Sequence, residues 1–245
     1  MAKQSGLGDQ LFIGGLDVGG DINAIGGLST PRETLPATGI TVSAMERMFG
    51  KRDAMAEFST YFNDATDQIH DALKGLPRTD VHLLYCRGEG VGNEAFGIVG
   101  KQIDYSFTRG DDGSLILGTS IPGNAYGADW CEQLTAGKDT HASATNGSTL
   151  DTTASASFGF QAYLQVFSVG SGTVEITLQD SANSTDWLDL TDGAFTDATG
   201  RTVERIQSSS ATATVRRYVR VITSGTFTDA VLAVAINKNA ATRAL

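Results

Sequence analysis

The stretch GTVEITLQD, residues 172–180, decides the fold class because apolar and polar residues alternate strictly along it. Val174, Ile176 and Leu178 fall on one face, and polar side chains fall on the other. A period of two is typical of a β-strand with one buried and one solvated face. The segment therefore predicts an antiparallel sheet that is covered on one side.

Segments with a similar pattern surround this stretch. We predict further strands at FGFQAYLQVF (158–167), around Trp187, at VRRYVRVIT (215–223) and at AVLAVAINK (230–238). Turns rich in Gly, Ser and Asp separate these segments, and none shows helical periodicity. Residues 151–245 are therefore expected to form an antiparallel β-sandwich of the immunoglobulin-like or jelly-roll-like kind.

The N-terminal part is also predicted to be mainly β. TDVHLLYCRG (79–88) is a nearly continuous apolar strand, and KQIDYSFTRGDDGSLILGTSI (101–121) is a hairpin. The hairpin turn is assigned to Asp111, Asp112 and Gly113. A single helix is expected within NDATDQIHDALKGLP (63–77), with Asn63 or Asp64 as its N-cap.

A change in composition suggests where this part ends. ASATNGSTLDTTASAS (142–157) has almost no bulky apolar residue, as is typical of a linker. We therefore expect two domains, with a β-sandwich or barrel carrying one helix in residues 1–150 and the second sandwich in residues 151–245.

Residues 27–53 are long, weakly periodic and interrupted by two prolines. Long irregular segments in compact domains usually serve a binding or interface role. We therefore expect an inter-subunit loop here. Its candidate contact residues are Arg32, Glu33, Thr34, Leu35, Glu46, Arg47, Met48, Lys51 and Arg52.

The glycine-rich run GGLDVGGDINAIGG (14–27) resembles a phosphate-binding loop only in spacing. It continues with Asp21 and Ile22, where a P-loop needs Lys followed by Ser or Thr, so its charge would repel phosphate. Alternation over residues 16–24 instead predicts a half-buried strand. Its glycines are expected to leave room for the close approach of another backbone or a neighbouring subunit.

Charge and composition exclude several function classes. The 245 residues carry a net charge of −10, of which −8 lies in residues 1–150 and −2 in the remainder. Such a chain should repel nucleic acid and anionic lipid. Two cysteines and three scattered histidines offer neither a disulfide framework nor metal-ligand spacing. We see no secretory signal, and we expect no enzymatic activity, cofactor or metal site.

Four segments in order carry a resemblance to a known family. They are DQLFIGGLDVGGDINAI (9–25), RDAMAEFSTYFNDATDQIHDALKGLPRTDVHLLYCRG (52–88), GKQIDYSFTRGDDGSLIL (100–117) and EQLTAGKDTHASATNGSTLD (132–151). Together they resemble the major tail (tail tube) protein of long-tailed, non-contractile, siphovirus-type bacteriophages, most closely that of actinobacterial phages. Residues 155–240 resemble, more loosely, the β-sandwich modules appended to phage tail proteins.

The resemblance implies an assembly role. Such proteins form hexameric rings that stack into a tube, and genomic DNA passes through the tube during ejection into the host. The implied partners are further copies of the chain, the tape measure protein, the tail terminator and the distal tail proteins. The implied location is the tail of the virion, assembled in the bacterial cytoplasm.

In such a tube the acidic bias would keep the lumen from holding DNA. Our candidates for lumen-facing residues are Asp17, Asp21 and Asp104. We expect the C-terminal sandwich to project outward, with weak contact to host-surface glycans, and we expect tubes to form without residues 153–245. The alternatives are a two-domain adhesin or carbohydrate-binding protein, and a capsid decoration protein.

Overall fold

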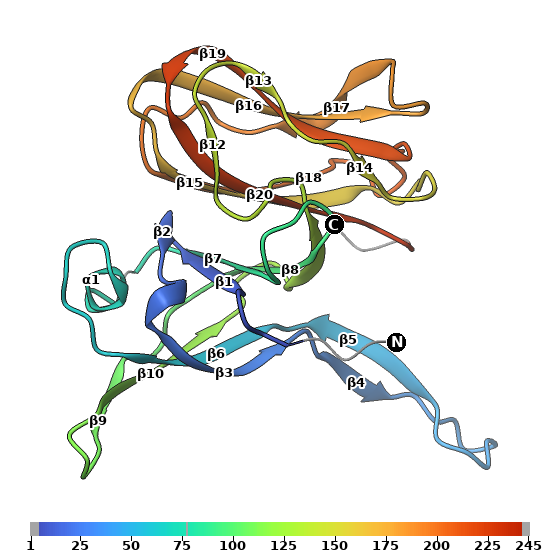
Figure 1. Ribbon diagram of the computed structural model, residues 1–245. Coiled ribbons are helices and arrows are strands. Elements are labelled where there is room, and N and C mark those ends of the chain that lie inside the picture. The colour runs from blue at the N-terminus through green and yellow to red at the C-terminus, as the bar shows by residue number, and fades with distance from the viewer. Residues whose placement is uncertain (1–4, 77, 242–245) are drawn as a thin grey trace.

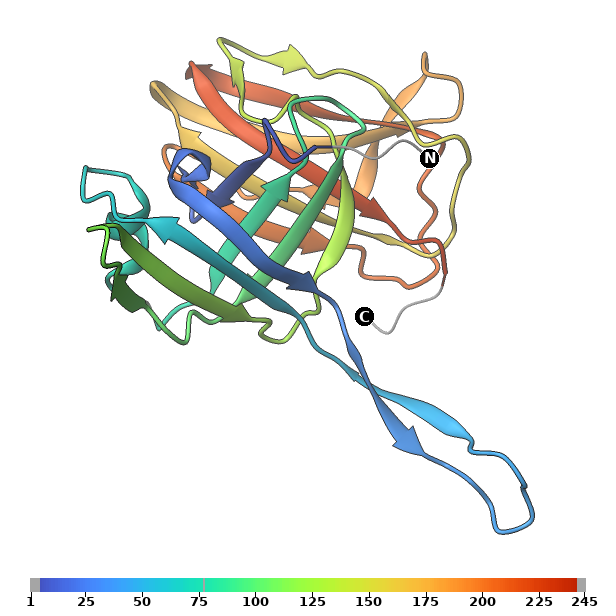
Figure 2. The same cartoon turned by 60° about the horizontal axis from the view of Figure 1, so that its bottom comes forward.

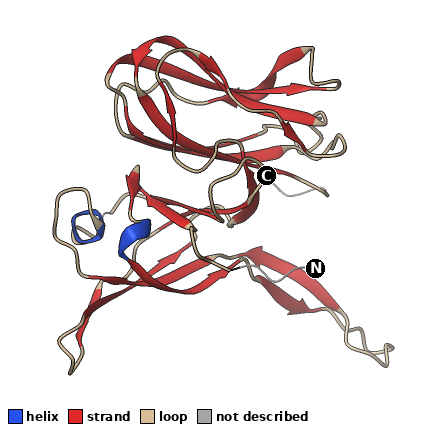
Figure 3. Cartoon of the chain, in the orientation of Figure 1, coloured by secondary structure: helices blue, strands red, loops and turns tan. Residues whose placement is uncertain are grey.

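The computed structural model describes residues 5–76 and 78–241 and confirms a mainly β fold built from antiparallel strands (Figure 1, Figure 3). Within these residues the helical elements are the 3-10 turn η1 (Gly19–Asp21) and the short helix α1 (Ile69–Leu73). The strands form three sheets and one separate hairpin.

The central sheet contains β18 (Thr202–Gln207), β15 (Phe160–Ser168), β20 (Ala230–Lys238), β11 (Asp129–Gln133), β8 (Glu94–Gly100), β7 (Val81–Cys86), β1 (Gln10–Ile13) and β2 (Leu16–Asp17), with β12 (Asp139–His141) also on β20. The sandwich sheet contains β13 (Thr145–Asn146), β19 (Tyr218–Thr228), β16 (Ser171–Ser181) and β17 (Trp187–Ala194), with β14 (Leu150–Asp151) also on β19. The basal sheet contains β3 (Ile22–Ser29), β6 (Met55–Tyr61), β10 (Leu115–Pro122) and β9 (Ser106–Arg109). The arm is the hairpin of β4 (Arg32–Pro36) and β5 (Arg47–Arg52).

The central sheet folds back on itself, so the molecule has four layers (Figure 1). Its inner face encloses a core in which Phe12 and Leu84 from one half meet Tyr163 and Ala235 from the other. The outer face of the half formed by β15 and β20 is covered by the sandwich sheet. The outer face of the half formed by β1, β7 and β8 is covered by the basal sheet and α1.

This arrangement ties together the two parts of the chain on either side of residue 150. Strand β11 pairs with β20, with Glu132 opposite Ile236, so one sheet runs through both parts. Residues 142–157, predicted to be a linker, contain β13 and β14, which pair with β19. The Ser- and Thr-rich composition of residues 142–157 therefore corresponds to short edge strands. The division of the chain into two domains stays a prediction.

Most of the predicted strands and the helix within residues 63–77 are confirmed, but the predicted N-cap of the helix and one strand are wrong. The helix is shorter than expected and begins after Gln68, because Asp67 has a positive φ that a right-handed helix does not accommodate. The side chain of Asn63 instead donates to Asp21 at 2.8 Å. The strand predicted over residues 16–24 is interrupted by η1, where the backbone N–H of Asp21 donates to the carbonyl of Val18. The turn redirects the chain from the central sheet into the basal sheet.

Candidate assembly surfaces

The basal sheet has one covered face and one exposed face. Ala56, Phe58 and Thr60 of β6 are buried against the core below α1. Glu57 and Tyr61 alternate with them along the strand and are exposed. The period of two therefore leaves one whole face of this sheet in solvent.

The middle of the exposed face carries small and acidic side chains. A shallow hollow in it is lined by Ala24, Gly26, Glu57, Ser59, Asp104, Gly118 and Ser120. The carboxylate of Asp104 accepts a hydrogen bond from the backbone N–H of Ser120 at 2.5 Å. The carboxyl groups of Glu57 and Asp104 make this hollow acidic.

Both edges of the basal sheet are open among the residues that the structure describes. Strand β3 pairs only with β6, and β9 pairs only with β10. The backbone N–H of Gly110 donates to the carbonyl of Ser114, so these two residues form a hydrogen-bonded pair. In an antiparallel ladder every second pair is hydrogen-bonded, so the pairs that contain Phe107 and Arg109 are not. The N–H groups of Phe107 and Arg109 therefore point away from β10. Exposed polar groups of this kind are a template for pairing with another chain.

The arm projects away from the layered body (Figure 2). The sequence predicts an irregular loop here, but the structure has a long hairpin in which Thr34 lies opposite Phe49 and Leu35 opposite Met48. Near the tip, the hydroxyl of Thr38 accepts from the backbone N–H of Glu46 at 2.9 Å. Eight of the nine predicted contact residues are exposed: Arg32, Glu33, Thr34, Leu35, Glu46, Arg47, Met48 and Lys51.

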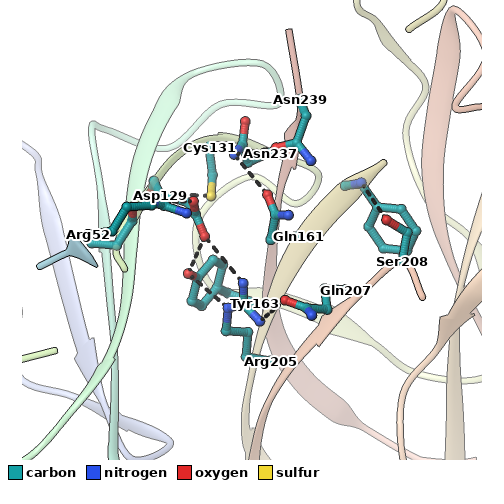
Figure 4. Close-up of polar contacts among 12 residues, drawn as sticks. Arg52, Asp129, Cys131, Gln161, Tyr163, Arg205, Gln207, Ser208, Asn237 and Asn239 are labelled. Carbon is teal, nitrogen blue, oxygen red and sulfur yellow. Dashed lines mark hydrogen bonds and ion pairs between the residues drawn. The ribbon is translucent and has the colours of Figure 1, made fainter. Parts of the chain in front are cut away.

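The ninth residue, Arg52, anchors the arm in the body. Its guanidinium lies 3.0 Å from the carboxylate of Asp129 and donates to the carbonyl of Ala128 at 2.8 Å. Asp129 also accepts from the hydroxyl of Tyr163 at 2.7 Å and lies 3.6 Å from Arg205 (Figure 4). These side chains come from β5, β11, β15 and β18, so the arm base is tied to both halves of the central sheet.

The protonation states in this network follow from burial. Burial, with the neighbouring Asp129 carboxylate as a second cause, raises the pKa of Tyr163 well above its usual value, so its hydroxyl stays protonated and donates. A buried carboxylate is costly unless it is paired and hydrogen-bonded, and Asp129 meets both conditions. The network therefore fixes the direction in which the arm leaves the body.

The three aspartates predicted to face the lumen lie in separate places. Asp17 forms an ion pair with Lys138 at 2.9 Å, at the edge of the central sheet. Asp21 is 8% exposed and accepts from the backbone N–H of Ile69 at the start of α1. Asp104 is the one of the three that lines the hollow of the basal sheet. The sequence analysis missed Glu57, although the alternation of MAEFSTY (55–61) carries the signal.

The remaining sequence predictions concern turns and cysteines. The hairpin between β9 and β10 is confirmed, and Asp111, Asp112 and Gly113 lie in its exposed turn. Cys86 and Cys131 are both paired with Ala95 in the sheet, on its two sides. The two cysteines are therefore separated by two strand spacings, about 9.6 Å, which is longer than the Cα–Cα distance that a disulfide can span.

No group of three or more His, Cys, Asp or Glu side chains in the described residues is arranged to hold a metal ion. None of the helices described is long and apolar enough to span a bilayer.

Comparisons with known proteins give distant structural likenesses. No family model matches the chain, and no curated protein matches it. A chain from the virion of a native gene transfer agent particle is similar with a TM-score of 0.41 and 11% identity, over 52% of this chain and 98% of that one. The SPP1 Dit (gp 19.1) protein gives 0.37 and 11%, over 94% and 99%. A chain of the phage p2 baseplate in its activated conformation gives 0.36 and 11%, over 94% and 98%.

Proposed function

We propose that this chain is a structural subunit of a bacteriophage tail tube and has no enzymatic role. The observation that carries the proposal is the basal sheet, which is open at both edges and has one whole face in solvent. A sheet of this kind is a liability in a monomer, because its free edges invite uncontrolled pairing. The family resemblance of residues 8–152 points to the same role.

Ring closure would remove both open edges. If β9 of one copy pairs with β3 of the next, the contact is heterologous, because it joins two different surfaces. When the rotation that relates neighbouring copies divides a full turn evenly, the copies form a closed ring without free strand edges. Six copies, as the resemblance implies, would join their basal sheets into one continuous barrel. The exposed face of each basal sheet would then line the lumen.

The charge of that face suits the passage of DNA. Glu57 and Asp104 would present carboxylates to duplex DNA, which carries one negative charge per about 1.7 Å of its axis. Repulsion over about one Debye length, roughly 8 Å at physiological salt, would keep the polyanion from adhering. We therefore assign the lumen charge to Glu57 and Asp104, since both line the hollow on the exposed face, whereas Asp17 is paired with Lys138 and Asp21 is buried.

The other parts of the chain take positions outside the lumen in this proposal. The arm would contact neighbouring subunits or rings, and the sandwich of residues 151–245 would face outward, where weak glycan contacts are accessible. The tape measure protein would occupy the lumen during assembly, with the terminator and distal tail proteins at the tube ends. The chain would assemble in the host cytoplasm and reside in the virion tail.

An edge-strand substitution tests the ring. Arg109→Pro removes a backbone N–H that points away from β10, whereas Arg109→Ala keeps it. We expect electron microscopy of the purified proteins to show rings or tubes for the wild type and Arg109→Ala, and only monomers for Arg109→Pro. A folded wild type that stays monomeric and binds glycans would overturn the proposal in favour of an adhesin.

A further inference from the structure

A hollow at the base of the arm reverses the charge of the chain. It has a volume of about 400 Å³ and lies between β5, the loop before β11, and strands β15 and β18. Its lining contains no Asp or Glu of the described chain and four basic residues: Arg32, Lys51, Arg52 and Arg205. The whole chain has a net charge of −10, so four cations around one hollow are a local excess. A concave surface lined by one sign of charge raises the local concentration of ions of the opposite sign.

Two of these cations share one carboxylate. The Nη2 atom of Arg52 lies 3.0 Å from one oxygen of Asp129, and Nη2 of Arg205 lies 3.6 Å from the other (Figure 4). The side chain of Arg205 is 5% exposed, and that of Asp129 is fully buried. Because one carboxylate balances one positive charge, the two guanidinium groups keep a surplus positive charge at the wall of the hollow. A buried charge is costly unless an opposite charge accompanies it.

The arm adds two further cations to this surplus. Arg32 lies directly opposite Arg52 in the pairing of β4 with β5. Like charges at opposite positions of a ladder destabilise it. Among the described residues, neither Arg32 nor Lys51 forms an ion pair. An anion in the hollow would therefore lower the repulsion among the four cations.

The guanidinium groups at the wall are held in place by other groups of the protein. Arg205 donates from Nε to the hydroxyl of Tyr163 at 3.2 Å and from Nη1 to the side-chain carbonyl of Gln207 at 2.9 Å. The guanidinium of Arg52 lies against Gly127, where an added Cβ would approach it to 2.8 Å. The hydrogen bonds of Arg52 within the described residues use Nη2, so its Nε and Nη1 are available as donors. A planar guanidinium that is already ordered binds an oxyanion with little further loss of entropy.

We propose that this hollow, here called the arm-base site, binds a small oxyanion of the phosphate class. Arg52 would donate hydrogen bonds to the anion, and the other three cations would balance its charge. Several cations around one site favour a doubly charged anion, such as hydrogen phosphate or sulfate, over a single carboxylate. Because Arg205 belongs to β18 and the other three cations belong to the arm, the anion would connect the arm to the body. The site lies within one copy, so the inference goes beyond the tail-tube function and does not depend on it.

Isothermal titration calorimetry of the full chain with inorganic phosphate tests the site. Sodium chloride keeps the ionic strength constant, so that general screening does not contribute to the difference. We expect saturable binding of one phosphate per chain, and weaker binding of acetate. The absence of saturable phosphate binding, or acetate binding as tight as that of phosphate, would overturn the inference.

Variants that remove single charges test the assigned residues. Arg32→Gln and Lys51→Gln leave the contacts of Asp129 intact, and each should weaken phosphate binding about two- to fivefold, the range for exposed charges. Arg47→Gln removes another exposed cation of the arm that does not line the hollow, and it should bind phosphate as the wild type does. Equal weakening by Arg47→Gln and Arg32→Gln would show a general effect of net charge and would overturn the inference.

Hydrogen exchange followed by mass spectrometry locates the bound anion. Phosphate should slow the exchange of backbone amides in residues 50–54 and 125–129, which adjoin the hollow, and leave residues 187–194 of β17 unchanged. Protection that is absent from the first two segments would contradict the placement of the site. Both measurements report on a single chain, so a wild type that binds phosphate but forms no rings would count against the proposed function alone.

Discussion

The ring of Tyr163 on β15 lies where a side chain at Gly97 on β8 would have to be. A Cβ built on Gly97 would approach three ring carbons of Tyr163 to 2.6 Å, closer than real Cβ contacts. The two residues belong to opposite halves of the folded central sheet, and their contact sits in its inner core. The packing of this core therefore requires glycine at position 97.

We expect Gly97→Ala to lower the free energy of unfolding by about 1–3 kcal/mol, because overpacking a filled core forces its neighbours to shift. Urea denaturation followed by tryptophan fluorescence measures the change. Gly20→Ala is the matched control, since a Cβ there meets nothing within 4 Å. Equal stabilities for the two variants would show that the halves are not packed as described.

Removing residues 153–245 should prevent the remainder from folding as a soluble unit. The deletion exposes Phe12, Leu84 and Val99, which are buried in the inner core, and takes β20 away from β11. This expectation reverses the one drawn from the sequence, which treated the C-terminal sandwich as dispensable. Solubility and circular dichroism of fragment 1–152 test it. A soluble fragment that unfolds cooperatively and assembles into tubes would restore the earlier view.

Glu132→Gln should stabilise the protein at neutral pH. Glu132 lies opposite Glu94 across β11 and β8, and burial, followed by the Glu94 charge, raises its pKa, while Lys238 opposes the shift. A carboxyl with a raised pKa in the folded state favours folding at low pH, and this contribution is lost as pH rises through that pKa. The gain should therefore be near zero at about pH 4 and reach about 0.2–1 kcal/mol, the usual effect of like charges across a ladder, at pH 7.

Denaturation of wild type and Glu132→Gln at several pH values gives the difference curve. Glu33→Gln on the exposed arm serves as the surface control for the same chemical change. A gain for Glu132→Gln that grows as pH falls would contradict the assigned cause.

Reversing the lumen charge should make tubes retain DNA. Glu57→Lys places a cation on the exposed face of β6 in every copy, and counterion release then favours phosphate binding. We expect duplex fragments to be retained by these tubes at about 150 mM salt and released at about 500 mM, with no retention by wild type. Glu175→Lys on the sandwich sheet carries the same charge change away from the lumen. Similar retention by both variants would argue against Glu57 lining the lumen.

Local patterns allowed most strands to be predicted, because period-two alternation depends on neighbours in sequence. Residues 172–180 fall within β16, with Val174, Ile176 and Leu178 fully buried as expected. The folding back of the central sheet could not be predicted this way, since it depends on pairings between distant strands. For example, Cys86 and Cys131 lie on the two sides of Ala95 in this sheet, although the two cysteines are far apart in the sequence.

The candidate assembly surfaces were also predicted only in part, because their local patterns can be read from the sequence and their long-range pairings cannot. Weak periodicity predicted an interface in residues 27–53. It did not reveal the hairpin, because Thr34 and its partner Phe49 are 15 positions apart (49 − 34) and no tight-turn motif joins their strands. Asp21 was assigned to a solvent-facing strand because the alternation was extended through η1. The glycines of the same run have two roles. Gly14 and Gly15, both with positive φ, make the tight turn between β1 and β2, and Gly15 also allows the close approach of another backbone that the sequence predicts. A Cβ on Gly15 would also lie 2.7 Å from the carbonyl of Val166.

Cryo-electron microscopy of the purified, assembled protein tests the central claim most directly. The account predicts hexameric rings in which β9 of each subunit pairs with β3 of the next, with Glu57 and Asp104 facing a continuous lumen. An assembly in which the exposed face of the basal sheet points outward, or is covered by the sandwich of a neighbour, would contradict it.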